Sequence, residues 1–334
     1  MTNNFKNNLL SAISMKFYFR KYSRLTLRPS YFHLPLLIPS LIKNSPTSFR
    51  DFVRFLKVNQ NSSSIISSNN DLPSISLLLI VAQKDFDKLK LCIDQIVKHS
   101  LNPIYKIEIV VPQTDLTSCM KILKQIELKI PIDLFNEDDI ININLREKMK
   151  LELKHKYGWA IQQLLTLHMV SRSDSYGVLA INADTFILRD QVWLNEKFVQ
   201  LLFQSPEYHE PYFKIIKKLF PKLNLVSYSH VTHHMLFQPE LLRDFFAKNG
   251  YNNLEDFMIK VLECFDKSQE SPFCIEFEPY AQALHNFYQD RIELRRFSNS
   301  NYSITKDSTG ITELIEKLDN QNLYNSINFH SWNN

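Results

Sequence analysis

Short apolar runs and amphipathic segments alternate along the first half of the chain. Residues 75–82 (ISLLLIVA) form a continuous apolar run of strand length, a pattern typical of a strand buried on both faces of a parallel sheet. Within residues 85–99, Leu89, Cys92 and Ile96 recur at helical spacing and share one face. A buried strand followed by an amphipathic helix is the beginning of a βαβ unit.

The same alternation continues to residue 183. Further strands are predicted at 106–112, 132–135 and 176–183, and further helices at 116–126 and 159–170. Strands that alternate with helices are joined by right-handed crossovers, which predicts an α/β fold with a doubly wound, Rossmann-like central sheet flanked by helices. The second half is more irregular, with helices predicted at 213–219, from residue 239 and at 279–287, and a strand at 225–229.

A linker divides the chain. Residues 58–74 (VNQNSSSIISSNNDLPS) are rich in Asn and Ser and almost uncharged, which is linker composition. We therefore expect a basic, helical N-terminal extension with its linker at residues 1–70 and a main domain at 71–334. The first 60 residues carry ten Lys and Arg against Asp51 alone, so nine positive charges gather there although the whole chain carries only +4.

The basic extension has three readings. Basic and aromatic residues mixed with Leu, as in residues 17–27, suit a solvated helix face, an anionic membrane surface or a nucleic acid. The solvated face is favoured, a peripheral membrane contact comes second, and no nucleic acid is expected. The apolar run 34–42 is too short for a bilayer span and contains two prolines, and the start lacks the features of a secretory signal. We expect a cytoplasmic protein.

Glycine and cysteine usage excludes several classes of site. The chain has only four glycines, and neither a G-x-G-x-x-G nor a P-loop pattern can be written with them. A bound nucleotide must therefore be held by something other than a glycine loop. The four cysteines form no C-x-x-C pair, and we expect reduced core thiols.

The strongest candidate for chemistry is Asn182-Ala183-Asp184-Thr185, directly after a buried strand. Ligands of open α/β sheets collect at the carboxyl ends of the strands. Acids two apart on an extended chain point to the same side, and hard ions such as Mg²⁺ or Mn²⁺ prefer their oxygens and neutralise a phosphate leaving group. Asp184 is the expected ligand, while Asn182 stands where a first acid would be and can contact a water or a ribose hydroxyl. Alternatively, Asp184 only caps the following turn.

Three histidines, His230, His233 and His234, fall within five positions. They could bind Zn²⁺, although the spacing identifies neither a further ligand nor an organised acid. They could also donate hydrogen bonds to phosphate or acceptor hydroxyls, or carry protons near neutral pH. A third reading is core packing, with His230 the first to be assigned to it.

Further candidates lie on predicted helices. Glu278, within Glu276-Phe277-Glu278-Pro279, precedes a proline at a helix start, so it is either a base for an attacking hydroxyl or a plain helix cap. Trp159 could stack on a base or sugar ring, or serve as core, and the amides of Gln162 and Gln163 could read hydroxyls. His330, near the chain end, could close over a metal or pyrophosphate.

The order of these segments resembles a known group of proteins. The blocks are YGWxxQQ at 157–163, xADT at 182–185, HHMLF at 233–237, FExY at 277–280 and FHSW at 329–332. Together they resemble a group of bacterial GT-A-fold nucleotide-sugar glycosyltransferase-like proteins classed as a domain of unknown function. The resemblance spans residues 74–332, and it departs from the usual pattern at Asn182, where an Asp is usual.

The resemblance implies a metal-assisted hexosyltransferase that uses a nucleotide-sugar donor. Because the basic N-terminus could hold such an enzyme near an anionic leaflet, we expect a glycan or lipid-linked acceptor in surface polysaccharide synthesis. The resemblance also implies a GT-A-like sheet with a nucleotide-sugar-binding half at 71–190 and an acceptor-binding half at 191–334. The implied roles are metal binding for Asp184 and His330, substrate binding for Trp159, Gln162, Gln163, Asn182 and His233, and catalysis for Glu278 and His234, with Mn²⁺ or Mg²⁺ as the cofactor.

Two alternatives stay open. Asn182 makes a catalytically inactive GT-A-like module conceivable, one that binds a glycan or a partner protein without turnover. The three histidines leave a zinc-dependent hydrolase as the weaker alternative.

Overall fold

The structure is a computed structural model of the whole chain. The residues that it describes are 72–205, 209–226, 228–266, 273–297, 299–302, 308–319 and 324–329. The predictions made for the N-terminal extension, residues 1–70, and for His330 lie outside the described residues.

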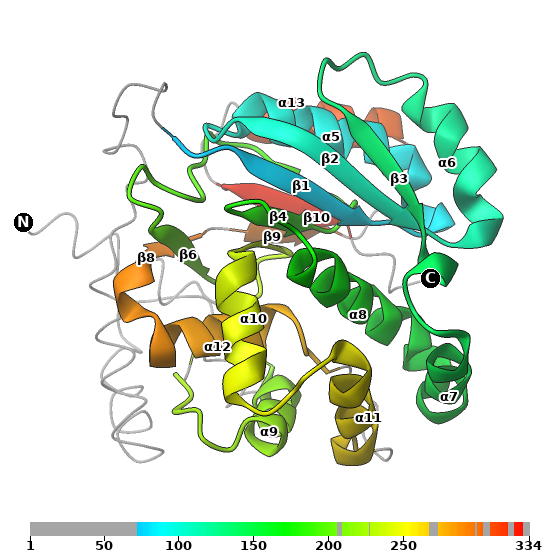
Figure 1. Cartoon of the computed structure of the whole chain (residues 1–334). Coiled ribbons are helices and arrows are strands. Elements are labelled where there is room, and N and C mark those ends of the chain that lie inside the picture. Colours follow the sequence, from blue (N-terminus) through cyan, green and yellow to red (C-terminus); the bar gives the residue numbers. More distant parts are fainter. Residues whose placement is uncertain are drawn as a thin grey trace, which may run out of the picture.

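A five-stranded sheet forms the centre of the molecule (Figure 1). Its strands are β1 (Ile75–Ile80), β2 (Ile104–Val111), β3 (Ile132–Asn136), β4 (Val178–Ile181) and β7 (His234–Phe237). In space their order is β3-β2-β1-β4-β7. The first four are parallel and β7 runs antiparallel to β4, which makes the sheet mostly parallel.

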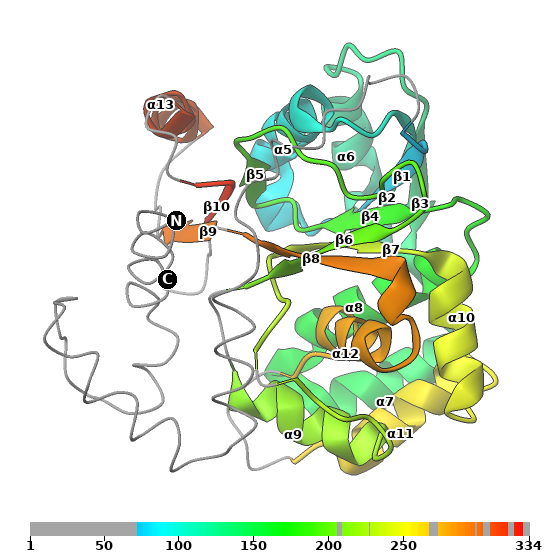
Figure 2. The same cartoon turned by 90° about the vertical axis from the view of Figure 1, so that its left-hand side faces the viewer.

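Helices cover both faces of this sheet (Figure 2). Above it lie α5 (Phe86–His99), α6 (Leu116–Leu123) and α13 (Ser308–Asp319). Below it lie α7 (Ile143–Leu153), α8 (Tyr157–Ser171), α9 (Glu210–Leu219), α10 (Pro239–Lys248), α11 (Leu254–Cys264) and α12 (Phe277–Phe287). Short 3-10 turns follow several strands: η3 (Gln83–Asp85), η4 (Gln113–Asp115) and η5 (Glu137–Asp139).

Strand β1 shows why the sheet is buried on both faces. Successive side chains of a strand point to opposite sides. Leu77 and Leu79 belong to the upper apolar core, together with Leu89 of α5. Leu78 belongs to the lower core, together with Leu164 of α8. The predicted α/β fold with a central, mostly parallel sheet between helix layers is therefore confirmed.

Two small sheets adjoin the main one. One contains β5 (Thr185–Ile187), β10 (Ser326–Phe329) and β9 (Asn299–Tyr302), and the other pairs β6 (Gln200–Gln204) with β8 (Ile292–Arg296). Strand β10 runs antiparallel to β5, and the Phe329 N–H donates to the Asp184 carbonyl oxygen at 3.0 Å. The end of the described chain therefore lies beside the residue predicted to bind metal.

Two local predictions are wrong. Residues 225, 226, 228 and 229 do not form a strand. The Val226 N–H donates to the side chain of Gln282 on α12 at 2.8 Å, so the segment is held by a helix and not by a neighbouring strand. Helix α12 begins at Phe277, with Glu276 at the N-cap position. Glu278 therefore lies inside the first turn and not ahead of it.

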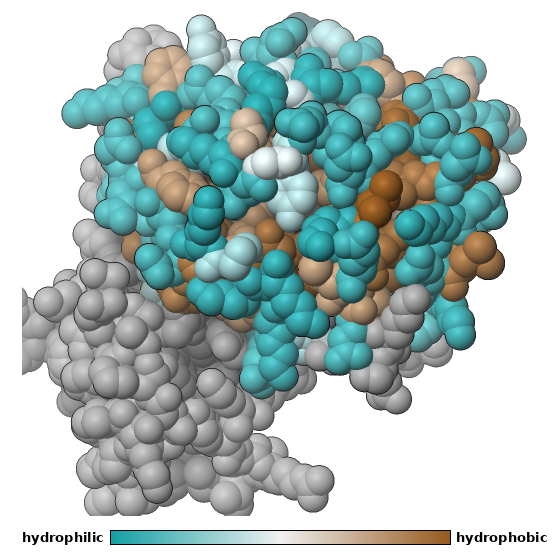
Figure 3. Space-filling view, turned by 60° about the horizontal axis from the view of Figure 1, so that its bottom comes forward, coloured by the Kyte–Doolittle hydropathy of each residue, from teal (hydrophilic) through white to brown (hydrophobic). Residues whose placement is uncertain are grey.

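The cysteines and the surface have the properties of an ordinary folded domain. All four cysteines are free, and Cys92, Cys119 and Cys274 are buried. Within the described ranges, no helix has both the length and the apolar character that a bilayer crossing needs. Figure 3 views the molecule from below and shows a mainly hydrophilic face on which hydrophobic side chains form small, separate groups.

Candidate functional site

A pocket lies at the carboxyl end of β4, on the lower side of the sheet. Five elements or their flanking residues form its wall: α8, the turn after β4, the residues before β7, α9 and the start of α12. The lining residues are Trp159, Gln162, Gln163, Asn182, Tyr212, Val231, His233, Cys274, Glu276 and Phe277. Five predicted substrate-binding residues, far apart in the sequence, therefore meet at one place.

Gln163 builds the back of the pocket. Its amide nitrogen donates to the Phe273 carbonyl at 3.1 Å, and its amide oxygen accepts from the Ile275 N–H at 2.7 Å. The indole N–H of Trp159 donates to the same Phe273 carbonyl. Because both ends of the Gln163 amide are used, this side chain positions the 273–276 segment and leaves Trp159 with its ring on the pocket wall.

Gln162 and Asn182 connect the helix to the strand end. The Gln162 amide nitrogen donates to Asn182 Oδ1 at 3.0 Å, while the Asn182 N–H donates to the His233 carbonyl at 3.1 Å. Both side chains are half-buried, and each has amide groups left for a ligand. The Asn182 oxygen itself is directed at Gln162.

His233 adopts an unusual backbone conformation. Its φ is 61°, in the left-handed region that residues other than glycine rarely occupy. This conformation turns the chain just before strand β7. The His233 side chain lines the pocket there. Strain of this kind persists only where the surrounding structure enforces it, and it gathers at functional sites.

Glu276 is the acid of the pocket. It is buried, and within the described residues its Oε2 atom has no hydrogen-bond partner. Burial raises its pKa to about 8, and a hydrogen bond with Thr166 opposes this only partly. The Thr166 hydroxyl also donates to the Gln162 carbonyl at 3.0 Å, so Thr166 links Glu276 to helix α8.

Glu278, the acid chosen from the sequence, occupies a different environment. Its Oε2 accepts from Ser229 Oγ at 2.7 Å and from the His230 N–H at 2.9 Å, and its Oε1 accepts from Gln282 Nε2 at 2.8 Å. It is fully buried, burial raises its pKa, and it does not line the pocket. Glu278 ties the 228–230 segment to α12. The sequence pattern offered both acids, and only the position where α12 begins could have favoured Glu276.

The other two histidines also lie off the pocket wall. His234 packs against Trp193, Phe203 and Phe297, with ring centroids 6.1, 5.6 and 4.7 Å away, and burial lowers its pKa to about 4. It is a neutral core residue.

His230 is fully buried, and its Nε2 lies 2.9 Å from Nε2 of His285. Burial lowers its pKa well below the usual range. Within the described ranges, no group of three or more His, Cys, Asp or Glu side chains could hold a metal ion. The zinc site considered for His230, His233 and His234 is therefore not formed.

Asp184 lies just beyond the pocket, in the turn between β4 and β5. It interacts electrostatically with Asp85 and Lys88 at the start of α5, on the upper side of the sheet. A two-acid metal site would use Asp184 with the residue at 182, but the Asn182 oxygen already accepts from Gln162. The described donor set therefore does not fit a protein-held Mg²⁺ or Mn²⁺ centre.

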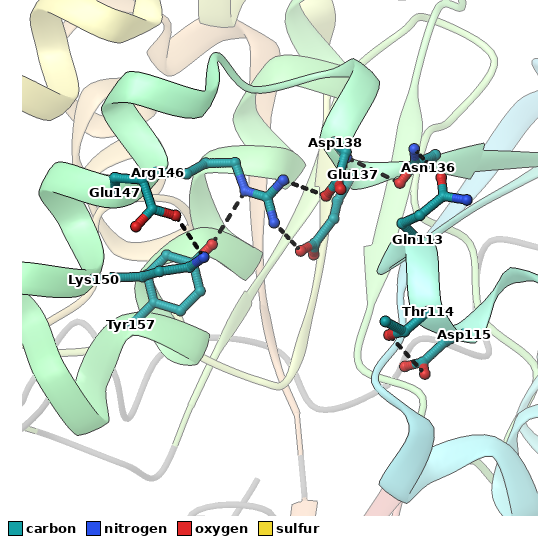
Figure 4. Close-up of polar contacts among 10 residues, drawn as sticks. All are labelled: Gln113, Thr114, Asp115, Asn136, Glu137, Asp138, Arg146, Glu147, Lys150 and Tyr157. Atoms are coloured by element: carbon teal, nitrogen blue, oxygen red, sulfur yellow. Dashed lines mark hydrogen bonds and ion pairs between the residues drawn. The ribbon is translucent and has the colours of Figure 1, made fainter.

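A second polar group lies further along the same edge, at the ends of β2 and β3 (Figure 4). Arg146 of α7 donates to Glu137 at 2.8 Å, to Asp138, and to the Tyr157 hydroxyl at 3.3 Å. Arg146 and Glu137 are buried and paired, so this group joins α7 and α8 to the end of β3. It therefore stabilises the edge next to the pocket and leaves no buried acid open to a ligand.

Comparisons with known proteins are limited to structure. No protein-family model matches the chain, and no curated protein sequence does. Mouse xyloside xylosyltransferase 1 is 8% identical, over 77% of this chain and 98% of that one, with a TM-score of 0.41.

Galactosyltransferase LgtC, solved with donor and acceptor sugar analogues, is 10% identical over 77% of this chain and 87% of that one, with a TM-score of 0.41. Mannosyltransferase Ktr4p of S. cerevisiae, solved with GDP, is 12% identical over 87% of this chain and 84% of that one, with a TM-score of 0.43. All three structures are glycosyltransferases, and the likeness is one of overall arrangement.

Proposed function

We propose that this chain is a glycosyltransferase that moves a sugar from a nucleotide-sugar donor to a hydroxyl group of its acceptor. The observation that supports this is the pocket at the carboxyl end of β4, which gathers an indole, three amides, an imidazole and a buried carboxyl group in one place. The mixture of one flat apolar ring with several hydrogen-bonding groups suits a sugar.

Glu276 is the proposed acid–base group. In the reaction, the acceptor oxygen bonds to the anomeric carbon and its proton passes to the Glu276 carboxylate. The bond from that carbon to the diphosphate breaks, and its electron pair stays on the phosphate oxygen. Because burial raises the pKa of Glu276 to about 8, the group works as a base at the alkaline side of neutrality. No step of this proposal is routed through a metal ion.

The other pocket residues bind. Trp159 supplies a face for the sugar ring, Gln162 and Asn182 contact its hydroxyls, and His233 lies opposite them. Residues 71–190 would then hold the nucleotide sugar and residues 191–334 would supply Glu276 and the acceptor side. Asp184, at the strand end, faces the diphosphate, and a bound Mg²⁺ or Mn²⁺ would have to come mainly with the donor's own oxygens.

The acceptor and the location are proposed from composition. The basic residues of the first 60 positions would hold a cytoplasmic enzyme at an anionic leaflet, beside a growing surface polysaccharide or lipid-linked glycan. Removal of residues 1–60 should then release the protein from sedimented membranes. Equal recovery of the full and shortened chains with the membranes would contradict this placement.

One observation favours a second candidate, an inactive binding module of the same fold. Asn182 takes the place of an acid and its oxygen is directed at Gln162. Such a module would bind a sugar or a partner without turnover, and Asn182→Asp would be the substitution that restores activity.

The test of the transferase proposal is a panel of UDP, GDP, CMP and dTDP sugars, with binding followed by calorimetry and turnover by nucleotide release. With Mg²⁺ or Mn²⁺ present we expect one donor to bind and turn over slowly, and Asp184→Asn to weaken both, because Asp184 would contact the ion that the donor brings. Asp174→Asn is the matched control, because Asp174 is exposed before β4, at the opposite end of the same strand. Folded protein that binds no donor would overturn the proposal.

A further inference from the structure

Three residues on one face of α8 contact the segment that carries Glu276. Trp159, Gln163 and Thr166 are spaced four and three positions apart along the helix, and side chains at this spacing lie on the same side of it. The indole N–H of Trp159 donates to the Phe273 carbonyl, and Thr166 hydrogen-bonds with the Glu276 side chain. This face of α8 therefore supports the chain just before α12 begins.

The amide of Gln163 makes the central contacts of this face. Its nitrogen donates to the Phe273 carbonyl at 3.1 Å, and its oxygen accepts from the Ile275 N–H at 2.7 Å. These two backbone groups are two residues apart, so the amide binds the segment in the way that a neighbouring strand would. The contacts fix the position of Ile275 on α8, and Glu276 is the next residue.

Gln163 has little left to offer a substrate. An amide nitrogen has two hydrogens, and the second one goes to the Trp159 carbonyl one helical turn earlier, at 3.2 Å. The side chain is only 1% exposed, although it lines the pocket. The arrangement of its bonds therefore suits a residue that holds another residue in place, not one that binds a hydroxyl.

Glu276 depends on such support because its own bonds do not fix it. Its Oε2 has no hydrogen-bond partner within the described residues, whereas Glu278 is bonded through both oxygens. The position of the Glu276 carboxyl group is therefore set by the backbone on its two sides. Helix α12 follows it, and the contacts of Gln163 precede it.

We propose that Gln163 is a positioning residue of the transfer reaction, which holds Glu276 so that its open Oε2 faces the acceptor hydroxyl. This inference rests on the proposed function, in which Glu276 takes the proton of the acceptor. A base must lie within hydrogen-bond reach of the proton that it removes. A displacement of about 1 Å can lower the rate about 100-fold, so the support of Gln163 acts on the rate and not on donor binding.

The experiment compares Gln163→Met with Gln200→Met in the full chain. Gln200 is the matched control because it is also fully buried, donates to the Leu236 carbonyl at 2.7 Å, accepts from the Tyr280 hydroxyl at 3.1 Å and does not line the pocket. Methionine keeps the length of the side chain and removes its hydrogen bonds. We expect both variants to unfold at a lower urea concentration than the wild type, by similar amounts.

Only Gln163→Met should change the chemistry. For the donor found in the panel, we expect kcat of nucleotide release to fall by about 10- to 100-fold, while the Kd from calorimetry stays near the wild-type value. The rate–pH profile should move to lower pH, because a loosened segment admits water and weakens the burial that raises the pKa of Glu276. The other titratable side chains of the pocket wall, Tyr212, His233 and Cys274, are unchanged in both variants.

Two further variants keep the inference testable. Gln163→Glu retains the shape and the acceptor for the Ile275 N–H, so it should lower kcat less than Gln163→Met, and it carries the test if the methionine variant does not fold. In the Glu276→Gln background, Gln163→Met should cause no further loss of rate, because the base is already absent.

The outcomes separate this inference from the proposed function. An equal loss of rate from Gln163→Met with and without Glu276, or a weaker Kd with unchanged kcat and pH profile, would overturn the inference and leave the transferase proposal intact. A wild-type chain that turns over no donor would instead contradict the proposed function, and this inference with it.

Discussion

Two buried glutamates at the start of α12, Glu276 at the N-cap position and Glu278 in the first turn, have opposite surroundings. Both have a pKa raised by burial. Glu278 is bonded through both oxygens to Ser229, His230 and Gln282. Glu276 lines a pocket, and its Oε2 has no partner within the described residues. A buried polar group without a partner destabilises the fold.

The comparison separates structural from functional acids. A carboxylate whose hydrogen bonds are complete has nothing left to offer a ligand and serves to hold elements together. A carboxylate with an open oxygen beside a pocket keeps an unfavourable environment that a ligand can relieve. By this criterion Glu276 is the catalytic candidate and Glu278 belongs to the scaffold.

The largest expected effect is the loss of turnover in Glu276→Gln. The amide keeps the size of the side chain and removes its acid–base function, so we expect the rate of nucleotide release to fall by about 100-fold or more. In the wild type the rate should rise with pH through about 8, because the base must lose its proton. A variant with unchanged rate and pH profile would remove Glu276 from the mechanism.

The difference in stability between this variant and the wild type should depend on pH in a defined direction. Glu276 has a folded pKa of about 8 against 4.5 normally, so the folded state holds a proton that the unfolded state releases. The wild type should therefore lose stability as pH rises from about 4.5 to 8. Relative to the wild type, Glu276→Gln should gain about 10 °C in Tm across this window. A constant difference at all pH values would show that Glu276 titrates normally.

Glu278→Gln should give the converse result, a loss of stability with little change in chemistry. Gln282, Ser229 and the His230 N–H would face a group with one acceptor in place of two, and we expect the free energy of unfolding to fall by about 1–3 kcal/mol. Urea denaturation measures this. The activity per folded molecule should stay near that of the wild type. A loss of activity without a loss of stability would contradict the structural role of Glu278.

Trp159→Ala should weaken donor binding by about 10-fold, because the ring face is lost from the pocket wall. Trp159→Phe keeps an aromatic face and loses only the N–H bond to Phe273, so it should bind more tightly than the alanine variant. Calorimetry with the donor identified in the panel compares them. Equal affinity of both variants would assign Trp159 to the core.

The smallest effect concerns the strained backbone at His233. His233→Gly and His233→Ala both remove the ring, but only glycine tolerates the φ of 61° without strain. We expect the glycine variant to be about 1 kcal/mol more stable than the alanine variant. Thermal denaturation of the pair measures the difference, and the absence of any gain would show that the backbone relaxes when the ring is removed.

Much of this arrangement was readable from the chain. Apolar runs of strand length alternated with amphipathic helices, and hydrophobic burial enforces that pattern locally, so the elements from β1 to β4 and the doubly wound sheet followed. The end of β4 was recognised as a site because parallel strands direct their carboxyl ends to one edge. Trp159, Gln162, Asn182 and His233 were named as binding residues, and the structure places them around one pocket.

Periodicity along continuous segments is sufficient to predict the fold class and the sheet edge at which a ligand is expected. Which acid has an open oxygen and which histidine lines the pocket depend instead on contacts between distant segments. Glu276 and Glu278 are neighbours in sequence, but Ser229 and His230 reach only one of them. The Gln162 amide meets the Asn182 side chain across 20 positions of the sequence. Contacts of this kind depend on packing between segments that are distant in the sequence, so a local sequence pattern does not predict them.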